Sequence, residues 1–148
     1  MDVKDALDEA VITSFADMAF MDAVVEPDDV PEADSVSVGQ LVHIRFGHPS
    51  SGFLTLYLGL TTKQRLVENV YGRGWDELSD SEVDDCLMEL ANIVAGNFML
   101  ERGEEEDRHA VSLPQVLYDE ADLPRAERSL SRHYRVDDEL IRVVVAHE

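Results

Sequence analysis

Four polar or small residues follow one another at helical spacing between positions 85 and 96. They are Asp85, Glu89, Asn92 and Gly96, separated by steps of four, three and four residues. At about 100° per residue, these positions share a sector roughly 60° wide on a helix. Carboxylates accept hydrogen bonds and attract cations, and the carboxamide both donates and accepts hydrogen bonds. The chemistry open to this stripe is therefore hydrogen bonding and the recognition of charge.

The glycine at position 96 adds a second feature to the stripe. A glycine in a helix interior costs about 1 kcal/mol relative to alanine, and it often lets another backbone or side chain approach closely. The same pattern also arises when Glu89 and Asn92 are ordinary solvated residues and Gly96 is a tolerated weak point. The spacing alone leaves both interpretations open.

The element that must position the stripe is a long helix ending near Arg102. Its start is predicted by the N-cap candidates Asp76, Ser79, Asp80 and Ser81. Its apolar residues gather on the side opposite the stripe, so we expect that side to be buried and the stripe to be exposed. The apolar set is Val83, Leu87, Leu90, Ala91, Val94 and Phe98.

The remaining elements predict an α+β fold. Apolar spacing predicts a first helix from Asp2 to about Val25, and Pro27 and Pro31 mark a linker after it. Alternating apolar residues predict two hairpins, and the second long helix of the fold lies between them. The predicted strands are Val36 to Phe46, Phe53 to Leu60, Val111 to Leu117, Tyr134 to Val136 and Leu140 to Ala146, with a helix capped by Thr61 or Thr62 and ending at Tyr71. We expect one domain over residues 1–148: a mainly antiparallel sheet with two long helices packed on it.

Charge and composition limit the classes of partner. The 148 residues are 45% hydrophobic, and 32 acidic against 12 basic residues give a net charge of −20. Such a surface repels nucleic acid and anionic membranes, although it would attract a partner with a basic patch. A lone cysteine, Cys86, and the lack of an apolar leader or of a long apolar run indicate a cytoplasmic protein.

Other candidate sites have less support. The five histidines show no paired metal-ligand spacing, so we expect no metal site. Ser112 has no glycine elbow or obvious base around it, which argues against a serine hydrolase. Gly72 and Gly74 are not followed by the lysine and hydroxyl residue of a phosphate-binding loop.

The run from Glu89 to Asn97, ELANIVAGN, resembles the signature helix of the CheC, CheX and FliY chemotaxis phosphatases. In that family a Glu is followed three residues later by an Asn and then by a Gly-Asn pair. Asp85, one turn before Glu89, fits the pattern, and Pro114 resembles the proline of a later family strand. CheC and FliY carry two copies of the motif. This chain has one, because its first helix has no Asn three residues after an acid, so it resembles the CheX branch.

The resemblance implies a phosphatase that acts on the phospho-aspartate of a CheY-type response regulator. It implies that Asn92 positions the attacking water and that Glu89 pairs with a cationic group of the regulator, such as its active-site lysine. Asp85 and Gly96 would belong to the partner-binding surface. The Mg²⁺ would be supplied by the regulator, with no cofactor bound by this chain.

Two other interpretations stay open. One is a non-catalytic CheX-like docking module that binds receiver domains in a chemotaxis, flagellar or other signalling assembly. The other, compatible with catalysis, is a homodimer in which the apolar strand from Leu140 to Ala146 pairs across a two-fold axis.

Overall fold

The computed structural model describes residues 2–27, 39–48, 52–102, 110–123 and 128–147. The helices are α1 (Val3–Ala19), α2 (Leu60–Tyr71) and α3 (Asp80–Glu101), with the short 3-10 helices η2 (Trp75–Glu77) and η4 (Glu120–Asp122). The strands are β1 (Ala23–Val25), β2 (Gln40–His48), β3 (Gly52–Leu58), β4 (Ala110–Val111), β5 (Gln115–Leu117), β6 (Arg128–Val136) and β7 (Glu139–His147).

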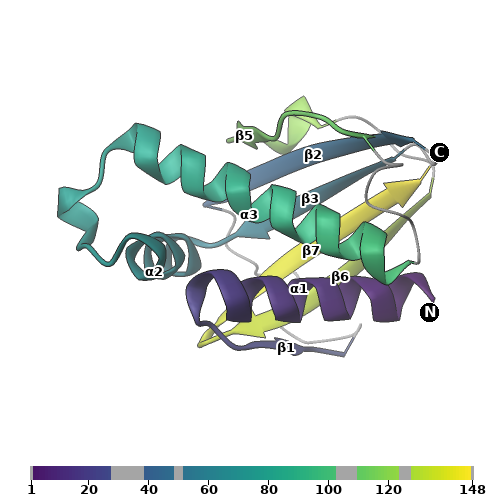
Figure 1. The fold of residues 1–148 in the computed structure, drawn as a ribbon, viewed down its shortest axis with the longest axis horizontal. Helices are drawn as coiled ribbons and strands as arrows, with labels where there is room; N and C mark the ends of the chain where they lie inside the picture. The colour runs from purple at the N-terminus through teal and green to yellow at the C-terminus, as the bar shows by residue number, and fades with distance from the viewer. Residues whose placement is uncertain (1, 28–38, 49–51, 103–109, 124–127, 148) are drawn as a thin grey trace.

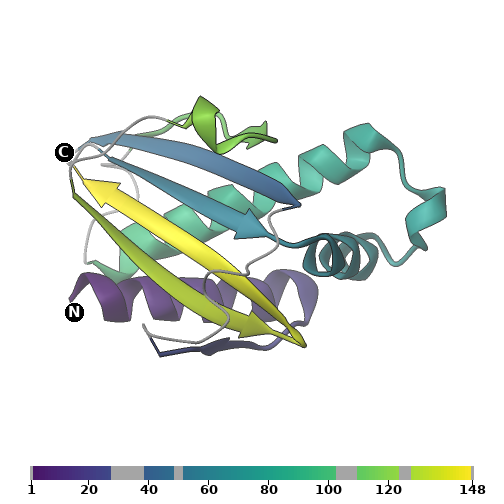
Figure 2. The same cartoon turned by 180° about the vertical axis from the view of Figure 1, so that it is seen from behind.

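One antiparallel sheet organises the described residues. Its order is β1-β6-β7-β3-β2-β4, and β5 pairs with a different part of β2 than β4 does. The helices α1 and α3 lie side by side across one face of this sheet, as Figure 1 shows, and Figure 2 shows the opposite face without a long helix. The predicted α+β fold, a mainly antiparallel sheet carrying two long helices, is confirmed.

The core lies between the sheet and these two helices. Alternate residues of the strands point into it, among them Val42, Ile44 and Phe46 of β2, all at most 1% exposed. Both long helices contribute buried apolar faces, which explains why their exposed faces are polar. Polar contacts also tie α1 to β6: Arg132 and the Tyr134 hydroxyl both donate to the carboxylate of Asp8, at 2.5 and 2.7 Å.

The two predicted hairpins are present. In the first, Val42 of β2 pairs with Leu56 of β3. In the second, β6 and β7 pair from Val136 and Glu139 outward, and Asp137 in the turn has a positive φ of 53°. Within the described parts of the chain, no helix is both long and apolar enough to cross a membrane.

The predicted end of the first helix was wrong. The helix α1 stops at Ala19 because Phe20 adopts a left-handed conformation (φ 56°), and its N–H bonds back to the Ala16 carbonyl. The following residues form β1, which pairs with β6. Apolar residues at positions 23 to 25 therefore belong to the sheet edge.

Three further boundaries differ from the prediction. The N-cap of α2 is Gly59, not Thr61 or Thr62, and the Glu139 carboxylate instead accepts the Thr62 N–H at 2.9 Å. The predicted strand from Val111 to Leu117 is interrupted at residues 112–114. Strand β6 begins at Arg128, six residues before the predicted start at Tyr134.

The suggested pairing of the last strand, Leu140 to Ala146, with its copy across a two-fold axis was wrong. Strand β7 is hydrogen-bonded to β3 on one side and to β6 on the other, so it has no free edge to offer a second copy. Two predicted features, the linker residue Pro31 and the start of the first strand at Val36, lie outside the described residues.

Candidate functional site

The helix α3 begins with a complete capping box. The Ser79 hydroxyl accepts the Glu82 N–H at 3.1 Å, and the Glu82 carboxylate accepts the Ser79 N–H at 3.1 Å. The bond from the Ser79 backbone and the ion pair with Arg73 hold the pKa of Glu82 below its usual value. The sequence thus fixes where α3 starts, and with it the phase of every later side chain.

The structure places the four predicted stripe residues on the outer side of α3. Asp85 and Glu89 are exposed, and Asn92 and Gly96 are partly exposed. On the opposite side, the side chains facing the sheet are fully buried; these are Leu87, Leu90, Ala91, Val94 and Phe98. One helix therefore brings a carboxylate and a carboxamide together, one turn apart, on a surface open to a partner.

Contacts within the molecule do not explain why these polar side chains are present. The side chains of Asp85, Glu89 and Asn92 form no hydrogen bond or ion pair with any other residue that the structure describes. The amide of Asn92 is therefore available to donate and accept hydrogen bonds outside the molecule.

Gly96 is also not required by the packing of the chain. A Cβ built at this position has no atom within 4 Å apart from its own local backbone, and the backbone φ is not positive. The open space beside Gly96 faces outward, next to the stripe. A closely approaching partner would account for a glycine here, whereas the fold alone does not.

Asn97, the second residue of the Gly-Asn pair, points elsewhere. Its amide donates to the Ser14 hydroxyl of α1 at 3.0 Å, and buried Ser14 donates in turn to the Ala10 carbonyl at 2.6 Å. Asn97 therefore joins the two long helices and does not belong to the stripe.

Pro114 and Cys86, which the sequence analysis also considered, are both buried. Pro114 is buried in the segment between β4 and β5, and β5 packs against α3. Cys86 lies on the buried side of α3, where burial, with a smaller contribution from the Glu89 charge, raises the pKa of its thiol to about 11. A thiol in this state is a poor nucleophile.

Sequence reasoning missed Leu100, which extends the stripe. It lies one turn beyond Gly96 and is 47% exposed, although it is a large apolar residue. The signal was its four-residue step from Gly96, which places it near the polar sector instead of the buried one. Among the described residues, no group of three His, Cys, Asp or Glu side chains is placed to hold a metal ion.

Comparison with solved structures supports the same architecture. Chemotaxis protein CheX from Vibrio vulnificus superposes with a TM-score of 0.78 at 14% identity, covering 100% of this chain and 97% of that one. CheX from Desulfovibrio desulfuricans gives 0.74 at 13% identity, covering 100% of both chains. A chain of the complex of CheX, CheY, BeF3 and Mg²⁺ from Borrelia burgdorferi gives 0.71 at 16% identity, covering 99% and 98%.

A search of curated protein sequences gives no match. The family model described as chemotaxis phosphatase CheX matches residues 41–134, a span that contains all of α3 and its exposed stripe. The chain therefore belongs to the CheX family of chemotaxis phosphatases.

Proposed function

We propose that this chain is a phosphatase that removes the phosphoryl group from the phospho-aspartate of a CheY-type response regulator. The observation that carries the proposal is the pair of Glu89 and Asn92, both without internal partners and one turn apart on the outer face of α3. Membership of the CheX family gives this pair its context. A reaction partner of this kind works in the cytoplasm, which is where we place the protein.

The phosphatase needs to supply little chemistry of its own to speed this reaction. An acyl phosphate is already reactive, and phosphoryl transfer depends mainly on positioning and on electrostatic stabilisation. Holding a water in line with the phosphorus makes its attack effectively intramolecular. The Asn92 carboxamide has one oxygen that accepts and one nitrogen that donates hydrogen bonds, so it can fix the orientation of that water.

Glu89 serves docking in this mechanism. Its exposed carboxylate would pair with a cationic group of the regulator, such as an active-site lysine, and set the register in which Asn92 enters. Asp85, one turn earlier, extends the negative stripe toward the start of α3. Gly96, with open space where a Cβ would stand, lets loops of the regulator approach the helix.

A relative supports the choice of partner. The Borrelia burgdorferi structure is a complex of CheX with CheY, BeF3 and Mg²⁺. We propose that the present chain likewise binds a CheY-like regulator and that the regulator supplies the Mg²⁺, with no cofactor bound by this chain.

We also propose that the protein forms a homodimer. Because β7 lies inside the sheet, a dimer joined through strand pairing would have to use β1 or the edge formed by β4 and β5. Size-exclusion chromatography with light scattering measures the mass directly, and a mass of 16.6 kDa at micromolar concentration would reject the dimer.

The decisive experiment measures loss of phosphate from a phosphorylated CheY-type receiver domain in Mg²⁺. Wild-type protein should accelerate the loss, Asn92→Ala should return it to the spontaneous rate of the receiver, and Glu89→Ala should weaken binding. Gln64→Ala, which removes an amide from α2, is the matched control and should behave as wild type. Binding of the phosphorylated receiver without faster phosphate loss would instead identify a non-catalytic docking module.

A further inference from the structure

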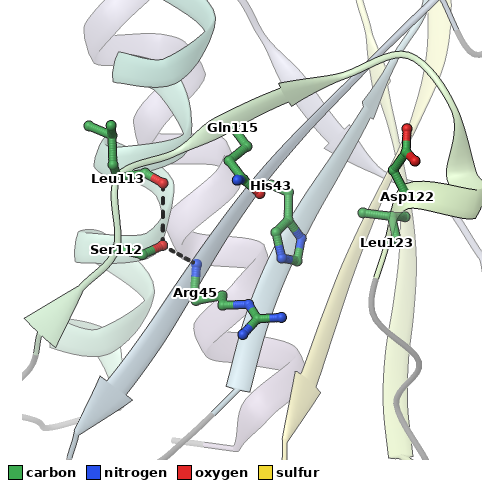
Figure 3. A pocket seen from close by; sticks show the side chains of 7 residues that line it. All are labelled: His43, Arg45, Ser112, Leu113, Gln115, Asp122 and Leu123. Atoms are coloured by element: carbon green, nitrogen blue, oxygen red, sulfur yellow. Dashed lines mark hydrogen bonds between the residues drawn. The ribbon is translucent and has the colours of Figure 1, made fainter.

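A cavity of about 450 Å³ is lined in part by His43 and Arg45 of β2. These residues alternate with the core residues Val42, Ile44 and Phe46, so they lie on the other face of the sheet. The lining of the cavity comes from β2, from the segment around β5 and from η4, as Figure 3 shows. The residues are His43, Arg45, Ser112, Leu113, Gln115, Asp122 and Leu123. Small-molecule sites usually fall in the range of about 300–1,000 Å³.

His43 is the most informative residue of this cavity. It is 2% exposed, its Nδ1 lies 2.9 Å from the Thr55 hydroxyl, and its buried Nε2 has no partner in the described structure. A buried polar atom without a hydrogen bond is costly, so the wall formed by His43 has unused hydrogen-bonding capacity. Burial, followed by the charge of Arg45, lowers the pKa of His43, so its ring is neutral.

Arg45 supplies an uncommitted cation beside that imidazole. Its side chain is exposed, and its guanidinium pairs with no carboxylate among the described residues, although the chain carries a net charge of −20. Its backbone N–H donates to the Ser112 hydroxyl at 2.9 Å. This bond holds the segment between β4 and β5, which lines the cavity, against β2. The exposed amide of Gln115 is likewise without a hydrogen-bond partner in the described structure.

The remaining lining limits what can bind. Asp122 contributes one negative charge, which disfavours a ligand with two negative charges, such as a phosphate dianion. Leu113 and Leu123 contribute apolar surface, and Leu113 is 82% exposed. A ligand that matches this cavity has one anionic group and an apolar part.

We propose that this cavity binds a small organic carboxylate. The guanidinium of Arg45 forms the fork-shaped pair with the carboxylate, the Gln115 amide donates to the same group, the His43 ring lines the wall beside it, and Leu113 and Leu123 contact the apolar part. The site is separate from the stripe on α3, because the sheet lies between them, and it does not depend on the phosphatase activity.

The test is a titration of the isotope-labelled protein with benzoate, followed by NMR. We expect saturable shifts of the His43 ring signals and of the Arg45 and Gln115 amides, and a loss of affinity of about tenfold or more in Arg45→Gln. Arg65→Gln on α2, which removes an equal charge far from the cavity, should bind benzoate as wild type does. Both arginines are exposed, so we expect neither variant to unfold. Thermal melts of the two variants check that they are folded.

Two comparisons identify the chemistry. Benzamide has the shape of benzoate without its charge, and we expect it to leave the three signals unchanged. Inorganic phosphate should bind more weakly than benzoate because of Asp122. The proposal is overturned if benzoate gives no saturable shift, if benzamide binds as well as benzoate, or if phosphate binds more tightly.

Discussion

The exposed faces of α1 and α3 carry the same spacing with different residues. The face of α1 is formed by Asp5, Glu9, Ile12 and Ala16, and that of α3 by Asp85, Glu89, Asn92 and Gly96. The two helices lie side by side on one face of the sheet (Figure 1), and each face ends four residues later in an exposed apolar residue, Phe20 or Leu100. The acids are shared, whereas the amide and the glycine occur only on α3.

The third position decides what each face can do. Ile12 is partly buried and packs against the core, so this position on α1 serves the fold. Asn92 at the matching position of α3 has no partner in the described structure. Two acids at helical spacing are an ordinary solvated face, and the unpartnered amide is what distinguishes α3.

The largest expected effect comes from making α3 resemble α1 at this position. Asn92→Ile removes the amide that we propose orients the water, and we expect catalysed dephosphorylation to fall by about 100-fold or more, to the spontaneous rate of the receiver. Phosphate release from a phosphorylated receiver measures it, and Gln64→Ile on α2 controls for a new exposed isoleucine. Retained activity in Asn92→Ile would show that the amide is not the difference between the two faces.

Removing one acid from each face should separate docking from bulk charge. Glu89→Gln should lower kcat/KM by about tenfold, mainly through KM, because it removes the carboxylate that we propose pairs with a cation of the regulator. Glu9→Gln makes the same change on α1 and should leave kcat/KM unchanged. Equal losses of kcat/KM in the two variants would mean that only the net charge of the protein matters. Raising the ionic strength would then reduce the two losses equally.

The small residues of the two faces allow a reciprocal exchange. Gly96→Ala should stabilise the protein by about 1 kcal/mol, because alanine is the better helix former and its Cβ has open space. Its KM should nevertheless rise severalfold, since the added methyl group occupies the space that we propose the regulator's loops approach. Ala16→Gly should destabilise by a similar amount without changing KM. Denaturant unfolding and steady-state kinetics measure the two effects, and an unchanged KM in Gly96→Ala would remove Gly96 from the docking surface.

The elements whose sequence signals are local could be predicted. The helix α3 has a cap at Ser79 and a buried stripe of regular spacing, and β7 is an apolar run next to a turn. Strand β6 was largely missed, because its inward positions include Arg132, whose charge is satisfied by Asp8 of α1, 124 residues away. A long-range pair of this kind cannot be seen in a window of sequence.

The limits of the site prediction have the same origin. The phase of α3 gave the outward direction of Glu89 and Asn92, because helix geometry alone sets it. The burial of His43 depends on β3 and on the segment around β5, so the alternation of residues within β2 could not predict it. The left-handed Phe20 that ends α1 also depends on tertiary structure, because β1 must reach β6.

The smallest expected effect concerns Asn97, the asparagine that shares a sequence motif with Gly96 but not its surface. Asn97→Ala loses the hydrogen bond to Ser14, worth about 1 kcal/mol, and regains about 0.6 kcal/mol in helix propensity, so unfolding should change by a few tenths of a kcal/mol. Ser14 keeps its bond to the Ala10 carbonyl, and no buried hydroxyl is stranded. Dephosphorylation should be unchanged, because Asn97 faces α1. A loss of activity in Asn97→Ala as large as that in Asn92→Ala, with stability preserved, would mean that the receiver approaches the seam between α1 and α3 instead of the outer face of α3.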